Sequence, residues 1–556
     1  MKMKAFEVVG EALAAEGVDT IFGLMTSDNM ALFGHLAARG IKVVRARTEH
    51  GVICMADGYA RATGRLGVAS VGAGPSAAMT ATALVTAQRR RSPLVVICGD
   101  VPVSNRHHLK GFDQEEYFRN AAGHCLTVAS TRTVIHDTYQ VLRRARSGSG
   151  PAVLNVPVDL LEAEVDMEDI GGDWRYMSPW TEPPAPVAPA ASIEQVAQLL
   201  RESERPLILA GRGAAEAGAR DAILRCAQKV GALLGTSVQG QYLFDHEFDV
   251  GVVGSLGFGP CMELVDQADL VVAVGAGFNV YTSSFLQLFP KAKLVHIDKR
   301  PEALGYMTPV DVAVLADARQ AMEAVGEVLE QTVGEDRVGF RTEETRRQIA
   351  AARNSLKVDY VPGDKVLDPR QVLDLLQQRL PEKRMDVVDA GHFLFFVMDH
   401  IRSRSPQDRI WTADFASIGI SLGAGIGAAV ARPDRHVTVF VGDGGFMMSL
   451  LELDTAARHR IPMTVVVMND EAYGAEVRYL ENRKESYDLA CFQTPDLEAV
   501  AKGLGCEAAT VRTVGELEAA CERIGRTEVP LVLDIRINPR VAHRHYVGRR
   551  NSAADK

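Results

Sequence analysis

Several features that mark other classes of protein are missing from these 556 residues. No two of the eight cysteines stand at C-x-x-C spacing, so we expect reduced core thiols rather than disulfides or a zinc site. No run of 18 uninterrupted apolar residues occurs, which argues against a membrane-spanning helix. Positive charge is not in excess either. Lys+Arg number 61 against 71 Asp+Glu, and the net charge of -10 disfavours a general nucleic-acid or anionic-membrane surface.

The start of the sequence gives no sign of a targeting signal. The segment MKMKAFEVVGEALAAEG has the pattern of an amphipathic helix and lacks an apolar signal-peptide core and a cleavage site. We therefore expect a cytoplasmic protein that is neither exported nor inserted into a membrane. Hydrophobic residues make up 47% and charged residues 24%, the balance of a globular chain with a large core. At about 150 residues per domain, the length predicts three or four domains.

Two stretches have the composition of linkers. The first, 171–192, contains five prolines, and the second, from about 333 to 369, holds a polar helical piece flanked by Gly and Pro. They divide the chain into predicted domains at 1–170, 190–335 and 368–540, followed by a tail at 541–556.

All three blocks alternate short Val- and Ile-rich runs with longer amphipathic segments. The expected strands are 19–24, 41–46, 67–72, 94–99 and 152–157 in the first block, 206–211, 270–277 and 293–298 in the second, and 385–391, 437–443, 463–470 and 531–537 in the third. Nearly continuous apolar strands separated by helices indicate parallel sheets covered on both faces. We predict three α/β domains.

The clearest chemical pattern lies in the third block. Gly442-Asp443-Gly444-Gly445 follows a strand and precedes a predicted helix through MMSLLELDTAARH. The next strand ends at Asp470, one helix crossover later, so the two carboxylates are expected to meet as ligands of Mg²⁺ bridged to a diphosphate. Two turn aspartates on unrelated loops would explain the same residues.

Three weaker patterns leave alternatives open. Glu49, after the strand at 41–46, opens a helix of small residues and is either a buried functional carboxylate or a helix cap. His107-His108 is either a loop pair or part of an active site. Gly211-Arg212-Gly213 suggests an NAD-binding turn, but Glu216 takes the place of the third glycine, so an NAD-dependent dehydrogenase is a poor fit.

Taken together, the whole chain resembles the thiamine diphosphate-dependent enzymes of the acetolactate synthase, pyruvate oxidase and benzaldehyde lyase type. The matching segments are GVDTIFGL (17–24), RTEHGVICMADGYARATGR (47–65), SPLVVICGD (92–100), GPAVLNVPVDL (150–160), GAGIGAAVARPD (423–434) and GDGGF…MNDEAYGAE (442–476). The most specific is GDG followed one crossover later by an Asn-Asn or Asn-Asp pair. The resemblance implies a pyrimidine-binding, a central and a diphosphate-binding domain, in that order, all Rossmann-like.

The resemblance also implies roles for single residues. Glu49 takes the place of the glutamate that protonates the aminopyrimidine ring of thiamine diphosphate. Asp443, Asp470 and the carbonyl of Ala472 take the places of the Mg²⁺ ligands. Ile418 matches the hydrophobic wedge that bends the cofactor. The full set implied to contact the cofactor is Glu49, Gly391, His392, Ala416, Ile418, Gly442, Asp443, Gly444, Gly445, Asp470, Ala472, Tyr473 and Gly474.

Substrate-side residues follow the family pattern less closely. Gln114 resembles the active-site glutamine of acetolactate synthases, and His107 and His108 resemble a histidine pair of 2-oxoacid decarboxylases. The loop 25–29 reads MTSDN where most relatives have a Pro-Gly turn. The segment 275–283 lacks the charged residues that hold flavin in acetolactate synthases, so we expect no FAD.

The resemblance implies a thiamine diphosphate- and Mg²⁺-dependent carboligase or decarboxylase. It would act on a short 2-oxoacid or 2-hydroxy-carbonyl compound through a C2 ylid and an enamine. A lyase of 2-hydroxy ketones or 2-hydroxyacyl-CoA is the alternative within the family, and a non-catalytic regulatory homologue is disfavoured by the retained Glu49 and metal motif. The implied assembly is a homodimer or homotetramer with active sites between subunits, and no nucleic acid or membrane is expected as a partner.

Overall fold

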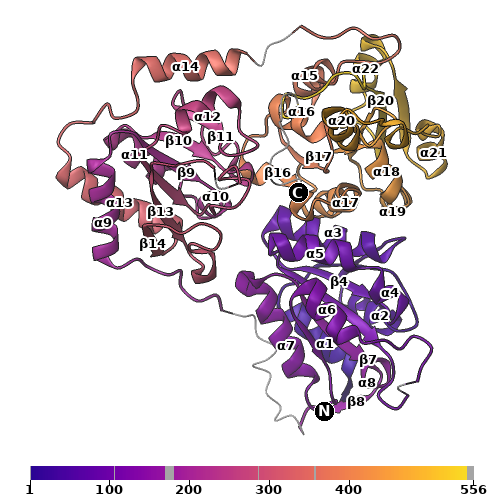
Figure 1. The fold of residues 1–556 in the computed structure, drawn as a ribbon. Coiled ribbons are helices and arrows are strands. Elements are labelled where there is room, and N and C mark those ends of the chain that lie inside the picture. The colour runs from indigo at the N-terminus through magenta and orange to yellow at the C-terminus, as the bar shows by residue number, and fades with distance from the viewer. Residues whose placement is uncertain (1, 106, 169–180, 286, 356–358, 547–556) are drawn as a thin grey trace. The chain divides into compact units, whose positions relative to one another are not determined.

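The computed structural model describes residues 2–105, 107–168, 181–285, 287–355 and 359–546. The described residues form two compact units, the first drawn from 1–182, 360–401 and 409–547 and the second from 183–359 and 402–408. The first unit contains two six-stranded sheets and the second unit one, each covered by helices (Figure 1). The predicted α/β class with three parallel sheets is confirmed.

The N-terminal sheet has the strand order β3-β2-β4-β5-β7-β6, with every pairing parallel. Its strands are β2 (Thr20–Gly23), β3 (Lys42–Arg45), β4 (Gly67–Val71), β5 (Leu94–Asp100), β6 (Cys125–Thr127) and β7 (Ala152–Pro157). Its helices are α1 (Ala5–Ala15), α2 (Met30–Ala38), α3 (Glu49–Thr63), α4 (Pro75–Ala78), α5 (Ala81–Arg90), α6 (Gln114–Ala122), α7 (Val134–Arg144) and α8 (Val158–Leu161). The short strands β1 (Lys2–Lys4) and β8 (Glu164–Asp166) pair with each other, antiparallel.

The sheet of the second unit has the order β11-β10-β9-β12-β13-β14 and is also parallel. Its strands are β9 (Pro206–Ala210), β10 (Leu233–Thr236), β11 (Asp249–Val252), β12 (Leu270–Val274), β13 (Lys293–Asp298) and β14 (Val312–Leu315). The helices are α9 (Ala190–Glu202), α10 (Arg212–Glu216), α11 (Arg220–Val230), α12 (Gly259–Val265), α13 (Ala318–Thr332) and α14 (Glu343–Asn354).

The C-terminal sheet has the order β16-β15-β17-β18-β20-β19, again parallel. Its strands are β15 (Arg384–Val388), β16 (Arg409–Trp411), β17 (His436–Gly442), β18 (Thr464–Asn469), β19 (Glu507–Val511) and β20 (Leu531–Arg536). The helices are α15 (Pro369–Arg379), α16 (Phe393–His400), α17 (Ser421–Ala431), α18 (Asp443–Ser449), α19 (Glu452–Arg458), α20 (Gly474–Arg483), α21 (Leu497–Gly503) and α22 (Val514–Cys521).

The N-terminal and C-terminal sheets share one topology. In both, the strand order starts from the second strand, passes through the first, third and fourth, and ends with the sixth and fifth. The direction in which successive strands are added across the sheet therefore reverses between β2 and β4 in one sheet and between β15 and β17 in the other. Ligands of open α/β sheets bind beyond the carboxyl ends of the strands at such points.

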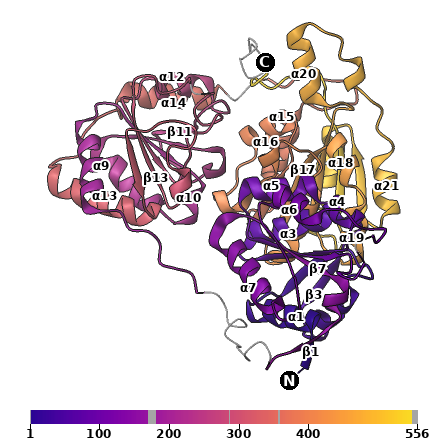
Figure 2. The same cartoon turned by 60° about the horizontal axis from the view of Figure 1, so that its bottom comes forward.

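Helices α3 and α17 join the two sheets of the first unit, and Figure 1 shows them against each other. Figure 2 shows α3 from another side, with β7 and α1 below it in this view. Their contact depends on glycine. A Cβ atom at Gly58 would lie 2.1 Å from the carbonyl oxygen of Ala424, and one at Gly427 would lie 1.9 Å from that of Met55. Because neither position has room for a side chain, the two backbones approach closely, and one apolar core continues from the N-terminal to the C-terminal sheet.

The structure differs from the sequence expectations in local detail. The helix predicted after Gly445 is two helices, α18 and α19, which break at Leu450 and Leu451. Residues 190–192, assigned to a linker, open α9.

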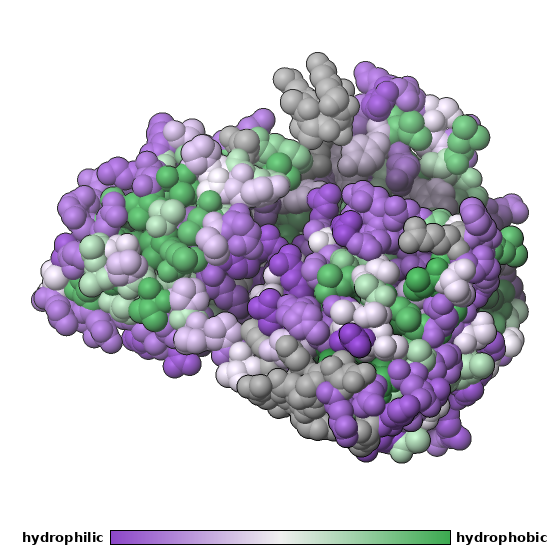
Figure 3. All heavy atoms as spheres, turned by 90° about the horizontal axis from the view of Figure 1, so that it is seen from below, coloured by the Kyte–Doolittle hydropathy of each residue, from purple (hydrophilic) through white to green (hydrophobic). Residues whose placement is uncertain are grey.

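Among the described residues, no helix is long and apolar enough to cross a membrane. All eight cysteines are free, seven are buried and Cys491 is exposed. On the face shown in Figure 3, hydrophilic residues predominate and apolar residues form separate patches.

Candidate functional site

Two aspartates meet at the carboxyl ends of β17 and β18, as predicted. Gly442 and Met468 are partners across the two strands, so Asp443 and Asp470 follow neighbouring strand ends. Asp443 is the first residue of α18 and is 1% exposed. Its Oδ2 atom has no hydrogen-bond partner among the residues that the structure describes. A buried carboxylate oxygen without a donor is costly, which indicates that something else is bound there.

The electrostatics of this pair fit a bound cation. Burial raises the pKa of Asp443, and the negative charge of Asp470 raises it further. Burial also raises the pKa of Asp470. Two buried carboxylates repel each other unless a proton or a metal ion lies between them. Carboxylate oxygens are the ligands that Mg²⁺ prefers, and the residues present therefore fit Mg²⁺.

Glycines surround the two aspartates where side chains would not fit. A Cβ atom at Gly474 would lie 2.6 Å from Oδ2 of Asp470, and one at Gly444 would lie 2.6 Å from a ring carbon of Tyr473. At Gly445 the nearest atom would be Oδ2 of Asp389, at 3.0 Å. Because these positions carry no side chains, the backbone here leaves room for the close approach of an anionic ligand such as a diphosphate.

Asp389 orders the loop that precedes α17. It follows β15, is fully buried, and accepts hydrogen bonds from the backbone N–H of Gly419 at 2.8 Å and from the hydroxyl of Ser421 at 3.1 Å. Burial raises its pKa to about 6. The loop carries half-buried Ile418 and, at a positive φ of 56°, Ala416. Both residues predicted to contact the cofactor thus belong to a segment that Asp389 holds at the strand end.

The residues predicted at the diphosphate end are occupied in part by the C-terminal segment. His392 is buried at the start of α16, and its Nε2 atom accepts a 2.9 Å hydrogen bond from the backbone N–H of His543. Its ring also contacts Phe396 and Tyr546 edge-on. Burial lowers the pKa of His392 to about 3, so its ring is neutral near pH 7. Gly391, beside it, has a φ of 139°.

Glu49 begins α3, as predicted, but it is not the cap of that helix. The capping side chain is Thr48, whose hydroxyl accepts a 2.9 Å hydrogen bond from the N–H of Gly51. Glu49 is half-buried, and its Oε1 atom accepts a 2.6 Å hydrogen bond from the hydroxyl of Ser76. The helix therefore has its cap already, and the carboxylate of Glu49 is oriented by Ser76 of the short helix α4, which follows β4.

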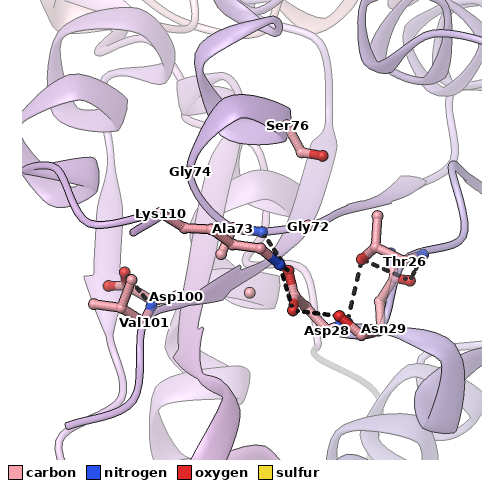
Figure 4. A network of polar contacts seen from close by, with 12 residues as sticks. Thr26, Asp28, Asn29, Gly72, Ala73, Gly74, Ser76, Asp100, Val101 and Lys110 are labelled. Carbon is pink, nitrogen blue, oxygen red and sulfur yellow. Dashed lines mark hydrogen bonds and ion pairs between the residues drawn. The ribbon is translucent and has the colours of Figure 1, made fainter. Parts of the chain in front are cut away.

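Two polar side chains fix the backbone at Ala73 and Gly74, in the turn between β4 and α4. Figure 4 shows Asp28, from the loop after β2, accepting from the N–H of Ala73 at 2.9 Å and from the ammonium of Lys110 at 2.8 Å. Gln114 accepts from the N–H of Gly74 at 2.6 Å. Asp28 lies in the segment whose sequence departs from the family turn, and it binds Lys110 near the point where the strand order of the N-terminal sheet reverses, between β2 and β4.

The predicted substrate-side residues have different surroundings. Gln114 is 1% exposed and its amide also donates to the carbonyl of Gly99 and to Asn155, so it fixes the strand ends around it. His107 is exposed in the loop after β5. His108 is half-buried, and its Nδ1 atom accepts a hydrogen bond from the N–H of Lys110. The structure does not bring either histidine into contact with Glu49.

The residues around the metal motif complete the site. Ala472 pairs with Cys491 in an isolated bridge, and the N–H of Tyr473 donates to the carbonyl of Ala490. Asn469, beside Asp470, turns away and donates to Asp534 at 2.7 Å. The sequence analysis did not assign a role in the site to Asp389, Ser76, Asp28, Lys110 or Glu452. Two of these had a signal. Asp28 lies in the loop 25–29 that departs from the family turn, and Asp389 lies in the predicted strand 385–391, although the observed strand β15 ends one residue before it.

Comparison with known proteins agrees with this geometry. Three models of thiamine pyrophosphate enzymes match the chain, the N-terminal TPP-binding domain over residues 3–122, the central domain over 193–325 and the C-terminal TPP-binding domain over 389–535.

Similar proteins cover nearly the whole chain. A probable acetolactate synthase large subunit of Methanocaldococcus jannaschii is 26% identical over 97% of this chain and 92% of its own. The sulfoacetaldehyde acetyltransferase of Alcaligenes xylosoxydans xylosoxydans is 28% identical, over 94% and 90%. The acetolactate synthase isozyme 2 large subunit of Escherichia coli (strain K12) is 27% identical, over 96% and 96%. With both sheets, the strand-end aspartates and all three domains accounted for, the chain is an enzyme of the thiamine pyrophosphate family.

Proposed function

We propose that this enzyme is a Mg²⁺-dependent carboligase or decarboxylase that uses thiamine diphosphate on a short 2-oxoacid or 2-hydroxy-carbonyl compound. The observation that supports it most is the buried pair Asp443 and Asp470, with its unpartnered carboxylate oxygen. A metal-linked diphosphate explains why a protein keeps two like charges there. The similar proteins are acetolactate synthases and an acetyltransferase, which supports C–C bond chemistry on small carbonyl compounds.

The residues of this chain would divide the work as follows. Asp443, Asp470 and the carbonyl of Ala472 would hold Mg²⁺, and the glycines at 442, 444, 445 and 474 would let the diphosphate approach the backbone. Ile418 would support the middle of the cofactor from the loop held by Asp389. Thiamine diphosphate, when bound, supplies an electron sink for the negative charge left on a carbonyl carbon when a neighbouring C–C bond breaks.

Glu49 is the proposed acid–base group. Its carboxyl group would hold the proton that is exchanged with the cofactor ring, while the hydroxyl of Ser76, at 2.6 Å from Oε1, keeps the carboxyl group in one orientation. Gln114, His107 and His108 remain candidates for contacts to the substrate. The close hydrogen bonds of Gln114 favour a role in shaping the loop at Gly74.

A lyase reaction on a 2-hydroxy ketone or a 2-hydroxyacyl-CoA uses the same residues and is the second candidate within the family. A nicotinamide-dependent dehydrogenase has less support. At Gly211 a Cβ atom would lie 2.3 Å from the carbonyl oxygen of Gly275, and the N–H of Gly213 donates to that same oxygen. The backbone thus fills the space between the ends of β9 and β12, where a dinucleotide would need room for its pyrophosphate.

The test is to incubate the enzyme, with thiamine diphosphate and Mg²⁺, with a panel of 2-oxoacids, aldehydes, 2-hydroxy ketones and 2-hydroxyacyl-CoA esters. Mass spectrometry for CO₂ and acyloins identifies decarboxylation and carboligation, and aldehyde release from the hydroxylated substrates identifies the lyase. Consumption or formation of reduced nicotinamide without these products would contradict the proposal. A flavin spectrum in the purified protein would contradict the expectation that FAD is absent.

A further inference from the structure

A buried glutamate of the C-terminal sheet reaches the segment that carries Glu49. Glu452 is the first residue of α19, is 1% exposed, and lies 404 residues along the chain from Thr48. Both residues belong to the first compact unit. Glu452 is not one of the proposed metal ligands. Because burial of an unpaired charge is strongly unfavourable, its buried carboxylate must be stabilised by hydrogen-bond donors.

Those partners are four donors, divided between the two carboxylate oxygens. Oε1 accepts from the backbone N–H of Thr48 at 2.9 Å and from its hydroxyl at 2.7 Å. Oε2 accepts from the N–H of Arg47 at 3.2 Å and from the hydroxyl of Thr455 at 2.7 Å. Two successive backbone N–H groups before α3 are therefore held by one side chain from another sheet.

The hydroxyl of Thr48 extends this arrangement into the helix. It donates to Glu452 and accepts from the N–H of Gly51, the third residue of α3. Gly51 is needed there, because a Cβ atom would lie 2.2 Å from Oε1 of Glu452. A negative charge at the start of a helix is also favoured by the helix dipole. Glu452 thus caps α3 through Thr48.

Glu49 lies between two fixed points as a result. Its backbone follows Arg47 and Thr48, which Glu452 holds, and its side chain is held by Ser76. We propose that Glu452 is a positioning residue for the acid–base group, and that it sets where the Glu49 carboxylate sits relative to the C-terminal sheet that carries the metal site. This inference rests on the proposed function of Glu49.

The chain offers a matched control two residues away. Asp454, on the same helix α19, forms a pair with the guanidinium of Arg47 at 2.5 Å that is partly exposed. Asp454→Asn weakens the contact between the same two segments without touching the amides before α3. A general loosening of this contact would therefore appear in Asp454→Asn as well, whereas loss of positioning would not.

Glu452→Gln is the principal variant. An amide keeps one oxygen but replaces the other with an NH₂ group, which cannot accept from a backbone N–H. At least one of the two amides loses its acceptor while size is unchanged. Thr48→Val removes the hydroxyl from the same arrangement, and Thr48→Ser retains it.

Two measurements follow these variants. Hydrogen–deuterium exchange of a peptide covering residues 45–51, in protein without cofactor, measures how strongly the backbone N–H groups of Arg47 and Thr48 are protected by their hydrogen bonds to Glu452. Proton exchange at C2 of bound thiamine diphosphate, by NMR after acid quench, reports Glu49. We expect faster amide exchange and C2 exchange slowed about 10- to 100-fold in Glu452→Gln and Thr48→Val, with cofactor still bound, because small misplacements of a reacting group have effects of this size. Thr48→Ser and Asp454→Asn should stay within about twofold of the unmodified enzyme.

Unchanged C2 exchange in Glu452→Gln with cofactor bound would overturn the inference, and so would an equal loss in Asp454→Asn. If Glu452→Gln does not fold, Thr48→Val is compared with Thr48→Ser instead. C2 exchange that is equally fast in these two variants, with cofactor bound, would overturn the inference. Failure of the proposed function is distinguishable. In that case Glu49→Gln would also leave C2 exchange unchanged, or the unmodified enzyme would not accelerate it at all.

Discussion

Asp443 and Asp470 lie at the ends of adjacent strands, and the charge of Asp470 raises the pKa of Asp443 beyond the effect of burial. Among the residues that the structure describes, one buried oxygen of the pair, Oδ2 of Asp443, has no donor. Such an arrangement opposes folding on its own and favours it when a divalent cation is bound.

Asp443→Ala should abolish binding of thiamine diphosphate with Mg²⁺ and leave the fold intact, because it removes a ligand and relieves a buried repulsion. In thermal unfolding, the cofactor with Mg²⁺ should raise the Tm of the unmodified protein by mass action and not that of the variant. Asp496→Ala serves as the control. It removes the cap of α21 and should cost about 1 kcal/mol while leaving the cofactor-induced shift in place. Tight cofactor binding by Asp443→Ala with a chelator present would contradict the metal assignment.

The affinity for Mg²⁺ should rise with pH. Both carboxyl pKa values are raised in the protein without metal, so protons must leave before the cation binds. Without metal, raised pKa values mean that stability from this pair declines as pH rises above the ordinary aspartate range. Calorimetry of Mg²⁺ binding in two buffers of different ionisation enthalpy measures the proton release. Asp470→Asn removes the repulsion and should reduce that release; an affinity independent of pH would contradict the account.

Lys110→Met should destabilise the protein near neutral pH and less so in acid. Burial acts to raise the pKa of Asp28, but the hydrogen bonds from Lys110 and the N–H of Ala73 outweigh it and lower the pKa. A lowered pKa stabilises the folded state above about pH 4 and ceases to do so as the pH falls through the folded value. Because Lys110 is one-third exposed, we expect a loss of about 1–2 kcal/mol in urea unfolding at pH 7. An equal loss at pH 3 would show that packing, not charge, is involved.

The active form should be at least a dimer. The first unit leaves large apolar side chains in solvent, among them Leu109 at 99% exposure and Met79 at 60%. Single exposed apolar residues also occur on monomers, so the prediction rests chiefly on the family resemblance, which implies active sites between subunits. Analytical ultracentrifugation at the assay concentration should give at least twice the chain mass of 60.2 kDa. A fully active monomer would contradict this prediction.

The sequence predicts most of what is local and little of what is distant. Long apolar strands such as β5 and β17 and the strand-end aspartates follow from periodicity and chain order. Short strands such as β6 and β16 have three residues each, too few to show a period. The break between α18 and α19, at Leu450 and Leu451, contains no glycine or proline, so the sequence carries no signal that predicts it.

The contacts that position Glu49 could not be predicted from the sequence, because the residues that make them are far apart along the chain. Ser76 is 27 residues from Glu49, and Glu452 is 404 residues from Thr48. Neither pair shares a helix face or a strand register, so no spacing rule links them. The first contact joins two elements of the N-terminal sheet, α3 and α4, and the second joins the N-terminal and C-terminal sheets, which meet through the glycines of α3 and α17.

The acid–base role of Glu49 is the central claim, and proton exchange at C2 of bound thiamine diphosphate tests it most directly. Thr48 already caps α3, so Glu49→Gln should change stability by only a few tenths of a kcal/mol, about the size of a dipole effect. The account predicts that Glu49→Gln binds the cofactor while C2 exchange slows by about 10²-fold or more, the scale of a lost acid–base group. Exchange as fast as in the unmodified enzyme, with cofactor bound, would contradict it.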